Sequence, residues 1–352
     1  MKNQFSVVVT SVSAPNPVLR SLASGCRERE LPFFVVGDVR SPADFQLEGC
    51  SFYSLERQRQ TGLRFAAICP ERHYARKNIG YLLAIQAGAE IIAETDDDNF
   101  PRPTFWNQRQ RRQRAAAIQD TGCVNTHAYF SDVTIWPRGL PLEAVHRPVP
   151  SFETLVEIEA DCPIQMGLVD GDPDVDAIYR LILPLPITFR CDRRIAIGHG
   201  SWSPFNSQNT TWWADAYPLM YLPSYCSFRM TDIWRSFVAQ RIAWTNSWSI
   251  LIHEPTVHQE RNVHNLIRDF EDEVPGYLHN MKIIEKLEGL RLVAGAENIS
   301  ANIQRCYEAL VELSVIGSEE LPLLEAWLAD LAQLRRLARS DQALARGAVA
   351  MP

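Results

Sequence analysis

The sequence predicts an α/β fold in which a mostly parallel sheet carries helices on both faces, with a helical extension at the C-terminus. Short apolar runs rich in β-branched residues alternate with helical patterns over residues 5–95, and this alternation is typical of βαβ units. From about residue 280 onward the segments are amphipathic with helical spacing and nearly free of Gly and Pro. These segments indicate two or three helices that pack together as a C-terminal unit.

The elements of the N-terminal half can be placed individually. Asn16 and Pro17 precede the run VLRSLAS, so Asn16 is the expected N-cap, Pro17 the first helical residue and Gly25 the expected stop. The apolar run 91–95 leads directly into an acidic stretch and indicates a buried strand. Further strands are expected at 5–11, 33–38 and 51–55, and a helix is expected within 71–89.

Composition excludes several classes of protein. The chain is 46% hydrophobic and carries a net charge of -7, which disfavours a disordered chain and general nucleic-acid binding. The cluster RQRRQR at 109–114 is more typical of a solvated helix face than of a nucleic-acid patch. The eight cysteines include no CxxC pair, which argues against a zinc site or a disulfide framework. No apolar run approaches the ~20 residues of a membrane span, and no signal peptide is evident, so we expect a cytoplasmic protein.

The strongest candidate site is the acidic run at the end of the strand 91–95. Asp96, Asp97 and Asp98 are consecutive, and three carboxylates at a buried strand end repel one another unless a cation compensates them. Ligands of open α/β sheets bind at this edge, and oxygen ligands suit Mg²⁺ or Mn²⁺ together with the oxygens of a diphosphate. The alternative is an acidic turn that caps the next helix.

Two further features are expected at the same edge. Arg76, Lys77 and Asn78 lie at a helix start, where cations and helix N-terminal amides favour phosphate groups. The strand ends at Thr10-Ser11 and at Asp38 could contact a nucleoside, with Asp38 accepting from the base or the ribose. Taken alone, the basic residues could be an exposed first turn, and each strand end could be a simple turn.

The sequence as a whole resembles a known family. The segments GYLLAIQAGAEIIAETDDDN (80–99), QMGLVDGDPDVDAIYRL (165–181), WWADAYPLMYLPSYCSFRMTDIWRSFVAQRIAW (212–244) and PTVHQERNVHNL (255–266) resemble the glycosyltransferase domain of the plant STELLO proteins. They resemble more distantly the reversibly glycosylated polypeptides, which are UDP-arabinopyranose mutases. The similarity covers about residues 5–270. It implies a GT-A fold, whose strand-end DxD motif holds a divalent metal against the diphosphate of a sugar nucleotide.

The resemblance assigns expected roles to individual residues. Asp96 and Asp98 match the DxD spacing and are the expected metal ligands, with Asp98 in direct contact. The resemblance also implies a late histidine as a further ligand. His258 is the best placed, and His253 and His264 are the alternatives. Asp232 stands where inverting members of the fold carry a catalytic base, and Arg229 is expected to stabilise the departing diphosphate. Thr231 could instead simply cap the helix that follows.

A second acidic segment is expected to form a loop beneath the donor sugar. Asp172 and Asp174 in GLVDGDPDVDAIYRL could accept hydrogen bonds from sugar hydroxyls. The alternative is a loop whose aspartates cap the helix DAIYRL, with Asp174 or Asp176 as the cap.

These expectations combine into one functional hypothesis. The chain is predicted to be a glycosyltransferase that depends on Mn²⁺ or Mg²⁺ and uses a UDP-sugar with a glycan or small-molecule acceptor. We expect residues 1–270 to form the GT-A domain, divided into a nucleotide-binding half (1–119) and a sugar and acceptor half (120–270), and residues 271–352 to form the helical unit. The apolar C-terminal helices are compatible with a homodimer. The alternatives are a UDP-sugar pyranose/furanose mutase and a non-catalytic nucleotide-sugar-binding scaffold.

Overall fold

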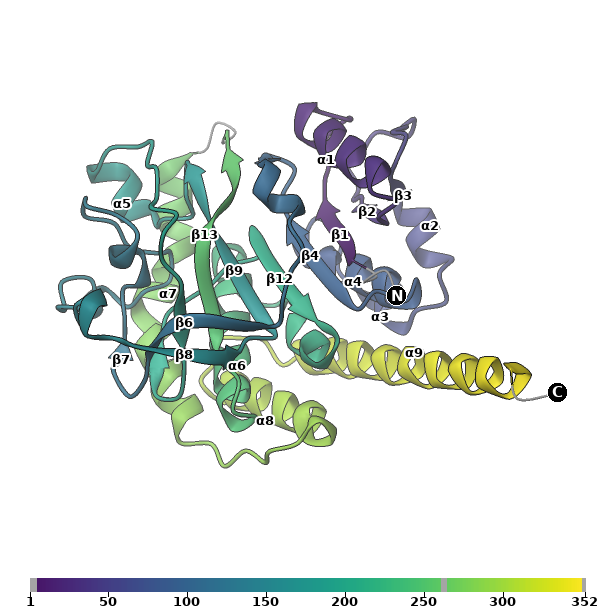
Figure 1. The fold of residues 1–352 in the computed structure, drawn as a ribbon. Helices are drawn as coiled ribbons and strands as arrows, with labels where there is room; N and C mark the ends of the chain where they lie inside the picture. Colours follow the sequence, from purple (N-terminus) through teal and green to yellow (C-terminus); the bar gives the residue numbers. More distant parts are fainter. Residues whose placement is uncertain (1–4, 261–264, 350–352) are drawn as a thin grey trace.

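The computed structural model describes residues 5–260 and 265–349, and a mixed sheet of eleven strands lies at its centre (Figure 1). The strands of this sheet are β1 (Phe5–Thr10), β2 (Phe33–Val36), β3 (Ser51–Tyr53), β4 (Ile91–Thr95), β5 (Asn99–Pro101), β6 (Arg112–Ile118), β8 (Val156–Asp161), β9 (Ile164–Gly171), β10 (Ile195–Ile197), β12 (Asn209–Trp213) and β13 (Ile250–Gln259). A small separate sheet pairs β7 (Gly122–Cys123) with β11 (Ser201–Trp202). The α-helices of the described residues are α1 (Pro17–Glu28), α2 (Leu55–Arg59), α3 (Arg64–Ile68), α4 (Lys77–Gln86), α5 (Ala177–Ile182), α6 (Thr231–Thr245), α7 (Leu266–Glu288), α8 (Ile299–Glu312) and α9 (Glu320–Val349).

The strand order identifies the fold. The sheet runs β3-β2-β1-β4-β12-β9-β13 and continues through β10, β6 and β8. Strands β1 to β4 pair in parallel, β12 is antiparallel to both β4 and β9, and β13 is parallel to β9. One antiparallel strand between two parallel groups in this order gives the GT-A fold, as predicted. The parallel pairing dominates the N-terminal group, whereas β12 and the β6–β8 and β10–β13 pairs make the whole sheet mixed.

Helix α1 begins as the sequence predicts but ends later. The side chain of Asn16 accepts from the Leu19 N–H at 2.8 Å, so Asn16 is the N-cap. The helix does not stop at Gly25 but continues to Glu28. A Cβ at Gly25 would lie 2.2 Å from a ring carbon of Trp106. The glycine therefore allows an aromatic ring to approach the helix and does not terminate it.

Strand β1 is buried on both faces, because helices cover both sides of the sheet. Val7 and Val9 pack in one apolar cluster with Leu19 of α1. Val8 points the other way, into a larger cluster that includes Ile79 of α4. Alternate residues of a strand face opposite sides, so a continuous apolar run is what a doubly covered strand requires.

The arginine cluster at 109–114 is not a helix face. Strand β6 begins at Arg112, so that interpretation is wrong. Arg111 binds Asp161 at 2.6 Å, and Arg114 pairs with Glu157 of the neighbouring strand β8. These negatively charged partners come from a strand more than forty residues later in the chain. The local sequence does not show them, so the arginines were interpreted as the solvent-exposed face of a helix.

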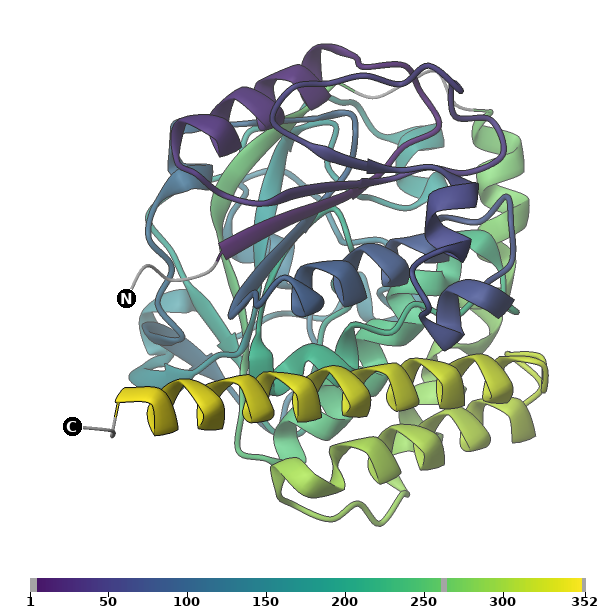
Figure 2. The ribbon, with the colours of Figure 1, turned by 90° about the vertical axis from the view of Figure 1, so that its right-hand side faces the viewer.

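The C-terminal helices pack on the body of the protein. Helix α7 starts at Leu266, before the predicted boundary at residue 270. Trp327 of α9 belongs to the same apolar cluster as the α4 side chains, and the carboxylate of Asp330 accepts from the N–H groups of Arg64 and Phe65 at the start of α3. Figure 2 shows α8 and α9 side by side below α4, and in Figure 1 the C-terminal end of α9 extends beyond the sheet. Within the described ranges, no helix is both long and apolar enough to cross a bilayer.

Burial of His127 predicts a measurable pH dependence of stability. The residue is 4% exposed, and burial lowers the pKa of its imidazole to about 4. In the unfolded chain the imidazole titrates near pH ~6.5, so below that pH the unfolded state binds more protons and the free energy of unfolding falls. We expect this group to cost about 1–2 kcal/mol between about pH 7 and about pH 5. Urea unfolding at the two pH values would measure it.

The variant His127→Phe should show a correspondingly weaker loss of stability on acidification, because the titrating group is gone. The exposed His146 provides the matched control, and His146→Gln should behave like the wild type. Equal pH dependence in His127→Phe and wild type would contradict the assignment.

Candidate active site

The carboxyl ends of the parallel strands meet at one edge of the sheet, and a cleft lies there. Thr10 ends β1, Asp38 lies just beyond β2, and Asp96 directly follows β4. Gln259 ends β13, and Asp232 lies in the first turn of α6. All five line the cleft. The fold therefore places strand-end side chains from both halves of the chain around one opening, where open α/β sheets bind ligands.

The cleft consists of two adjoining hollows of about 480 and about 390 Å³. Both are lined by Thr10, Val12, Tyr74, Asp97 and Phe228, so they are continuous. The larger one, called here the first hollow, is further lined by Ser11, Val36, Gly37, Asp38, Val39, Arg40, Arg72, His73 and Arg76. The other, called here the acidic hollow, is further lined by Asp96, Asp98, Arg138, Asp174, Ser207, Gln208, Arg229, Asp232 and Gln259.

Asp96 is held by a lysine from α4. The buried ammonium of Lys77 donates to Asp96 Oδ1 at 2.6 Å and to two backbone carbonyl oxygens. Desolvation raises the pKa of Asp96; Lys77 opposes this effect, and the negative charges of Asp97 and Asp232 reinforce it. The Asp96 side chain keeps 38% of its surface exposed, so its pairing with Lys77 leaves it at the wall of the cleft.

The other two members of the acidic run have different partners. The hydroxyl of Ser11 donates to Asp97, and the amide of Asn16 donates to the Asp97 carbonyl at 2.7 Å. The Gln259 amide donates to Asp98 Oδ2 at 2.8 Å. The trio is therefore fixed from three sides, by β1, α4 and β13.

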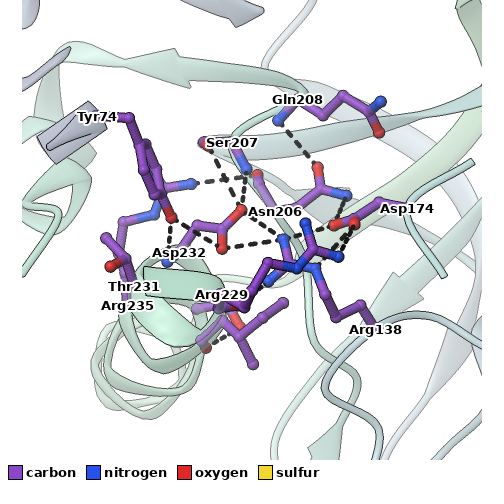
Figure 3. Close-up of polar contacts among 12 residues, drawn as sticks. Tyr74, Arg138, Asp174, Asn206, Ser207, Gln208, Arg229, Thr231, Asp232 and Arg235 are labelled. Atoms are coloured by element: carbon purple, nitrogen blue, oxygen red, sulfur yellow. Dashed lines mark hydrogen bonds and ion pairs between the residues drawn. The ribbon is translucent and has the colours of Figure 1, made fainter. Parts of the chain in front are cut away.

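Arg138 connects two further carboxylates (Figure 3). Its guanidinium binds Asp174 through Nε at 2.8 Å and Nη2 at 2.7 Å, and Nη2 also lies 3.0 Å from Asp232 Oδ2. Arg138 is 5% exposed. A charge-assisted, two-pronged contact of this kind fixes the geometry of both carboxylates.

Asp232 has further hydrogen bonds inside the acidic hollow. The Ser207 N–H donates to Oδ2 at 3.1 Å, and the Tyr74 hydroxyl donates to Oδ1 at 3.2 Å. Helix α6 begins at Thr231, so the N-cap position is occupied by Met230, whose side chain makes no capping bond. Thr231 therefore does not act as the helix cap, and Asp232 lies in the first turn, where the helix dipole favours a carboxylate.

Arg229 and Asp172 each form an ion pair with a residue outside the group around Arg138 and Asp232. Arg229 binds Glu273 of α7 at 2.8 Å and lies 3.9 Å from Asp174. Asp172 binds Arg180 at 2.8 Å and is not among the residues that line the two hollows. Asp176, four residues later, is the N-cap of α5, which confirms the capping alternative for this one aspartate.

Two of the predicted phosphate ligands are held by contacts within the protein. Arg76 is 2% exposed, and its guanidinium donates to Gln58 Oε1 and to the carbonyls of Cys69 and Pro70. Asn78 is fully buried. Its amide nitrogen donates to the Leu222 carbonyl, and its amide oxygen accepts from the Leu222 N–H. These contacts are structural: they hold the loop before α4 and the loop after β12 in place.

The histidines lie apart from the acidic trio. Alternate residues of β13 face opposite sides of the sheet, and Gln259, which lines the acidic hollow, puts His258 on the other face, against Gly171. His253 binds its neighbour's backbone carbonyl and does not line the cleft. His264 lies outside the described residues. Among residues 5–260 and 265–338, no three His, Cys, Asp or Glu side chains are grouped to hold a metal by themselves.

The first hollow contains a second set of fixed polar groups. Asp38 accepts from the N–H groups of His73 at 3.0 Å and Val39 at 2.7 Å. Burial lowers the pKa of His73 to about 4, although Asp38 partly opposes this. His73 Nδ1 accepts from the Ala75 N–H, and its buried Nε2 has no hydrogen-bond partner. The imidazole is therefore neutral near pH ~7, with an Nε2–H donor at the wall of the hollow.

Sequence reasoning missed several residues of the cleft wall, among them Tyr74, Arg138, Ser207 and Gln259. Tyr74 lies two residues before Arg76, and Gln259 directly follows His258, the histidine that was favoured. Strand alternation was the signal that could have identified Gln259. Arg138 lies in an irregular, proline-rich stretch with no motif, so only the fold could place it.

A buried ion pair supports the cleft from beneath. Glu94 of β4 is fully buried and accepts from both terminal nitrogens of Arg235 of α6, at 3.0 and 2.9 Å. Tyr81 and Trp212 donate to the same carboxylate. Arg235 also donates to the carbonyl of Asn206 at 3.1 Å, and the Asn206 side chain binds Asp174. The pair thus joins the strand that carries the acidic trio to the helix that carries Asp232.

Sheet topology and cleft together define a GT-A-type protein with an acidic motif at the end of its fourth strand. Residues 229–338 match the model of the STELLO glycosyltransferases. This part of the chain is therefore similar to the STELLO glycosyltransferases, in agreement with the resemblance that the motifs predicted. The match extends into the C-terminal helices, which the predicted resemblance had left out.

Curated relatives align over most of the chain. "Probable glycosyltransferase STELLO2" of Arabidopsis thaliana is 27% identical over 92% of this chain and 44% of its own length. "Probable glycosyltransferase STELLO1" of the same plant is 26% identical with the same coverage. The chain therefore spans less than half the length of these relatives.

Two solved structures align more weakly. One is a mycobacterial protein, with a TM-score of 0.42, 10% identity, and coverage of 79% of this chain and 75% of that one. The other is the M. tuberculosis glucosyl-3-phosphoglycerate synthase, with a TM-score of 0.39, 11% identity, and coverage of 79% and 81%.

The Glu94–Arg235 pair predicts a specific pattern of stability. Arg235→Met should lower the free energy of unfolding by about 3–5 kcal/mol, because it leaves a buried carboxylate without its countercharge. The double variant Glu94→Gln/Arg235→Met should recover most of this loss, because the uncompensated charge is gone. Urea unfolding of both single variants and the double variant measures the coupling. A double variant no more stable than Arg235→Met would contradict the role given to the pair.

Proposed function

We propose that this domain transfers a sugar from a nucleoside-diphosphate sugar, specifically a UDP-sugar, to an acceptor hydroxyl. The observation that carries the proposal is the acidic hollow at the end of β4, continuous with a first hollow lined by cations and strand-end polar groups. The names of the relatives support the same chemistry, although the chain spans only 44% of their length.

In this proposal the nucleoside occupies the first hollow. Thr10 and Ser11 lie on its floor, and Asp38 and His73 supply an acceptor and a donor for the base or ribose. The diphosphate then lies at the junction of the two hollows, beside Asp97, and Arg72, which lines the first hollow, is proposed to offer it charge-assisted hydrogen bonds. Arg76 and Lys77 act indirectly, since their contacts fix the loop and Asp96.

We further propose that Asp96 and Asp98 bind Mn²⁺ or Mg²⁺. The donor set fits, because hard divalent cations take carboxylate oxygens and commonly use only one or two protein carboxylates together with substrate phosphates. Asp98 lines the acidic hollow, and Asp96 remains partly exposed there. When bound, such a cation neutralises charge that develops on the departing diphosphate. His258 is not included, since it faces the other side of the sheet.

Asp232 is the proposed base toward the acceptor hydroxyl. Its carboxylate lines the acidic hollow and is oriented by Ser207, Tyr74 and Arg138. Resting hydrogen bonds of this kind do not exclude a base, because catalytic contacts often rearrange in the substrate complex. Arg229, which lies 3.9 Å from Asp174, is proposed to stabilise the leaving group, and Asp174 to bind the donor sugar.

The acceptor is proposed to be a glycan or a small molecule. Arg111 and Arg114 belong to the cluster for which a nucleic-acid patch was the disfavoured interpretation, and both are ion-paired. A homodimer and a cytoplasmic location stay predictions.

Asp98→Ala should abolish the Mn²⁺-dependent part of UDP affinity. Loss of a partner that only supports a metal ligand already costs about 10–100-fold, so removal of a ligand should cost at least that much. Isothermal titration with UDP, with and without Mn²⁺, measures the effect, and Asp132→Ala at an exposed position serves as the control. Unchanged affinity in Asp98→Ala would refute the metal assignment.

Asp232→Asn should preserve UDP affinity within a few-fold and lower turnover by at least about 100-fold, the range expected for loss of a general base. The isosteric amide can still accept from Ser207, so the hollow keeps its shape. Donor hydrolysis, followed across a panel of sugar nucleotides, provides the readout. A parallel loss of UDP affinity and turnover would assign Asp232 to binding or folding.

A further inference from the structure

We infer that the side-chain amide oxygen of Gln259 is a ligand of the divalent cation, which makes the site an all-oxygen one. The inference rests on the proposed function, in which Asp96 and Asp98 hold that cation. It concerns a residue that the acidic motif does not include, and it replaces the imidazole expected from His258.

The backbone places Gln259 directly beside the acidic trio. The end of β13 pairs with β5, where Gln259 lies opposite Asn99. The next residue, Glu260, donates its N–H to the Asp98 carbonyl at 3.2 Å. The Gln259 amide nitrogen reaches Asp98 Oδ2 at 2.8 Å. The side chain thus lies within one hydrogen bond of the residue proposed to contact the cation.

The second end of this amide has no partner. Gln259 is 7% exposed, and its Oε1 is buried without a hydrogen bond. Burying an amide carbonyl that accepts no hydrogen bond is unfavourable, and such groups in folded proteins usually have a reason. A cation bound at Asp98 would give this oxygen a partner. Rotation of the amide about its last torsion exchanges the positions of the NH₂ group and the oxygen, which turns the oxygen toward Asp98.

The neighbouring histidine cannot take this role from its present position. His258 and Gln259 are consecutive on an extended strand and face opposite sides of the sheet. A Cβ at Gly171 would lie 2.7 Å from the His258 ring, so the imidazole packs against that backbone, whereas Gln259 lines the acidic hollow. Only one of the two side chains can therefore reach the trio.

The donor chemistry follows from the residue type. Two carboxylates and one amide oxygen are hard ligands that favour Mg²⁺ and Mn²⁺, whereas an imidazole nitrogen would shift preference toward Zn²⁺, Ni²⁺ and Co²⁺. The inferred site is therefore expected to lack the added preference for these metals that an imidazole ligand would give.

Electron paramagnetic resonance of Mn²⁺ in the presence of UDP tests the inference on the whole chain. The free Mn²⁺ signal gives the affinity, and the variants compared are Gln259→Ala, Gln259→Glu and the matched neighbour His258→Gln. We expect Gln259→Ala to weaken Mn²⁺ binding at least about tenfold. Gln259→Glu, which keeps an oxygen ligand at the same length, should bind at least as tightly as the wild type, and His258→Gln should be unchanged. Circular dichroism verifies that each variant is folded.

Pulsed measurement of nitrogen coupling to bound Mn²⁺ gives an independent readout. The wild type should show no directly coordinated protein nitrogen, and Gln259→His should introduce one. The inference is overturned if Gln259→Ala binds Mn²⁺ like the wild type, or if the wild type shows nitrogen coupling that His258→Gln removes. A wild-type chain that binds no Mn²⁺ with UDP would instead refute the proposed metal dependence, and the inference with it.

Discussion

Repulsion among carboxylates gathered at one cleft is the constraint on which this structure depends. Five of them line the acidic hollow: Asp96, Asp97, Asp98, Asp174 and Asp232. Like charges this close disfavour ionisation and folding unless they are compensated. The chain compensates them with buried cations, Lys77 against the first residue of the trio and Arg138 between the last two carboxylates. Hydrogen bonds from Ser11 and Gln259 hold the remaining two.

The rest of the fold holds these countercharges in place. Arg138 lies in the irregular segment after β7, so its position depends on packing against α6 and on Asp174 after β9. The Glu94–Arg235 pair joins β4 to α6 in a fully buried setting. Helix α9 contributes from a distance, because Glu320 at its start accepts from the backbone of Ser224 and Tyr225 in the loop that leads to α6. The helices after residue 266 therefore support the loops around the cleft as well as the hydrophobic core.

Features that depend on local sequence patterns or family motifs were predicted, whereas features that depend on contacts between distant residues were not. The strand 91–95, the Asn16 cap and the GT-A order rest on local pattern and on family motifs, and they were predicted. The predicted end of helix α1 lay too early in the sequence, because the role of Gly25 depends on its contact with Trp106, far along the chain. The acidic trio was identified because three consecutive carboxylates after a buried strand are rare. Arg138 was missed because no local signal distinguishes it.

The choice between His258 and Gln259 illustrates a more general limit. A motif search favours the residue type that most often binds metals, whereas strand geometry permits only one face to reach the site. The charge balance of the acidic hollow makes that choice consequential. Five carboxylates line the hollow that an anionic diphosphate would enter. A divalent cation offsets negative charge there, and a neutral amide oxygen contributes a ligand without adding charge of either sign.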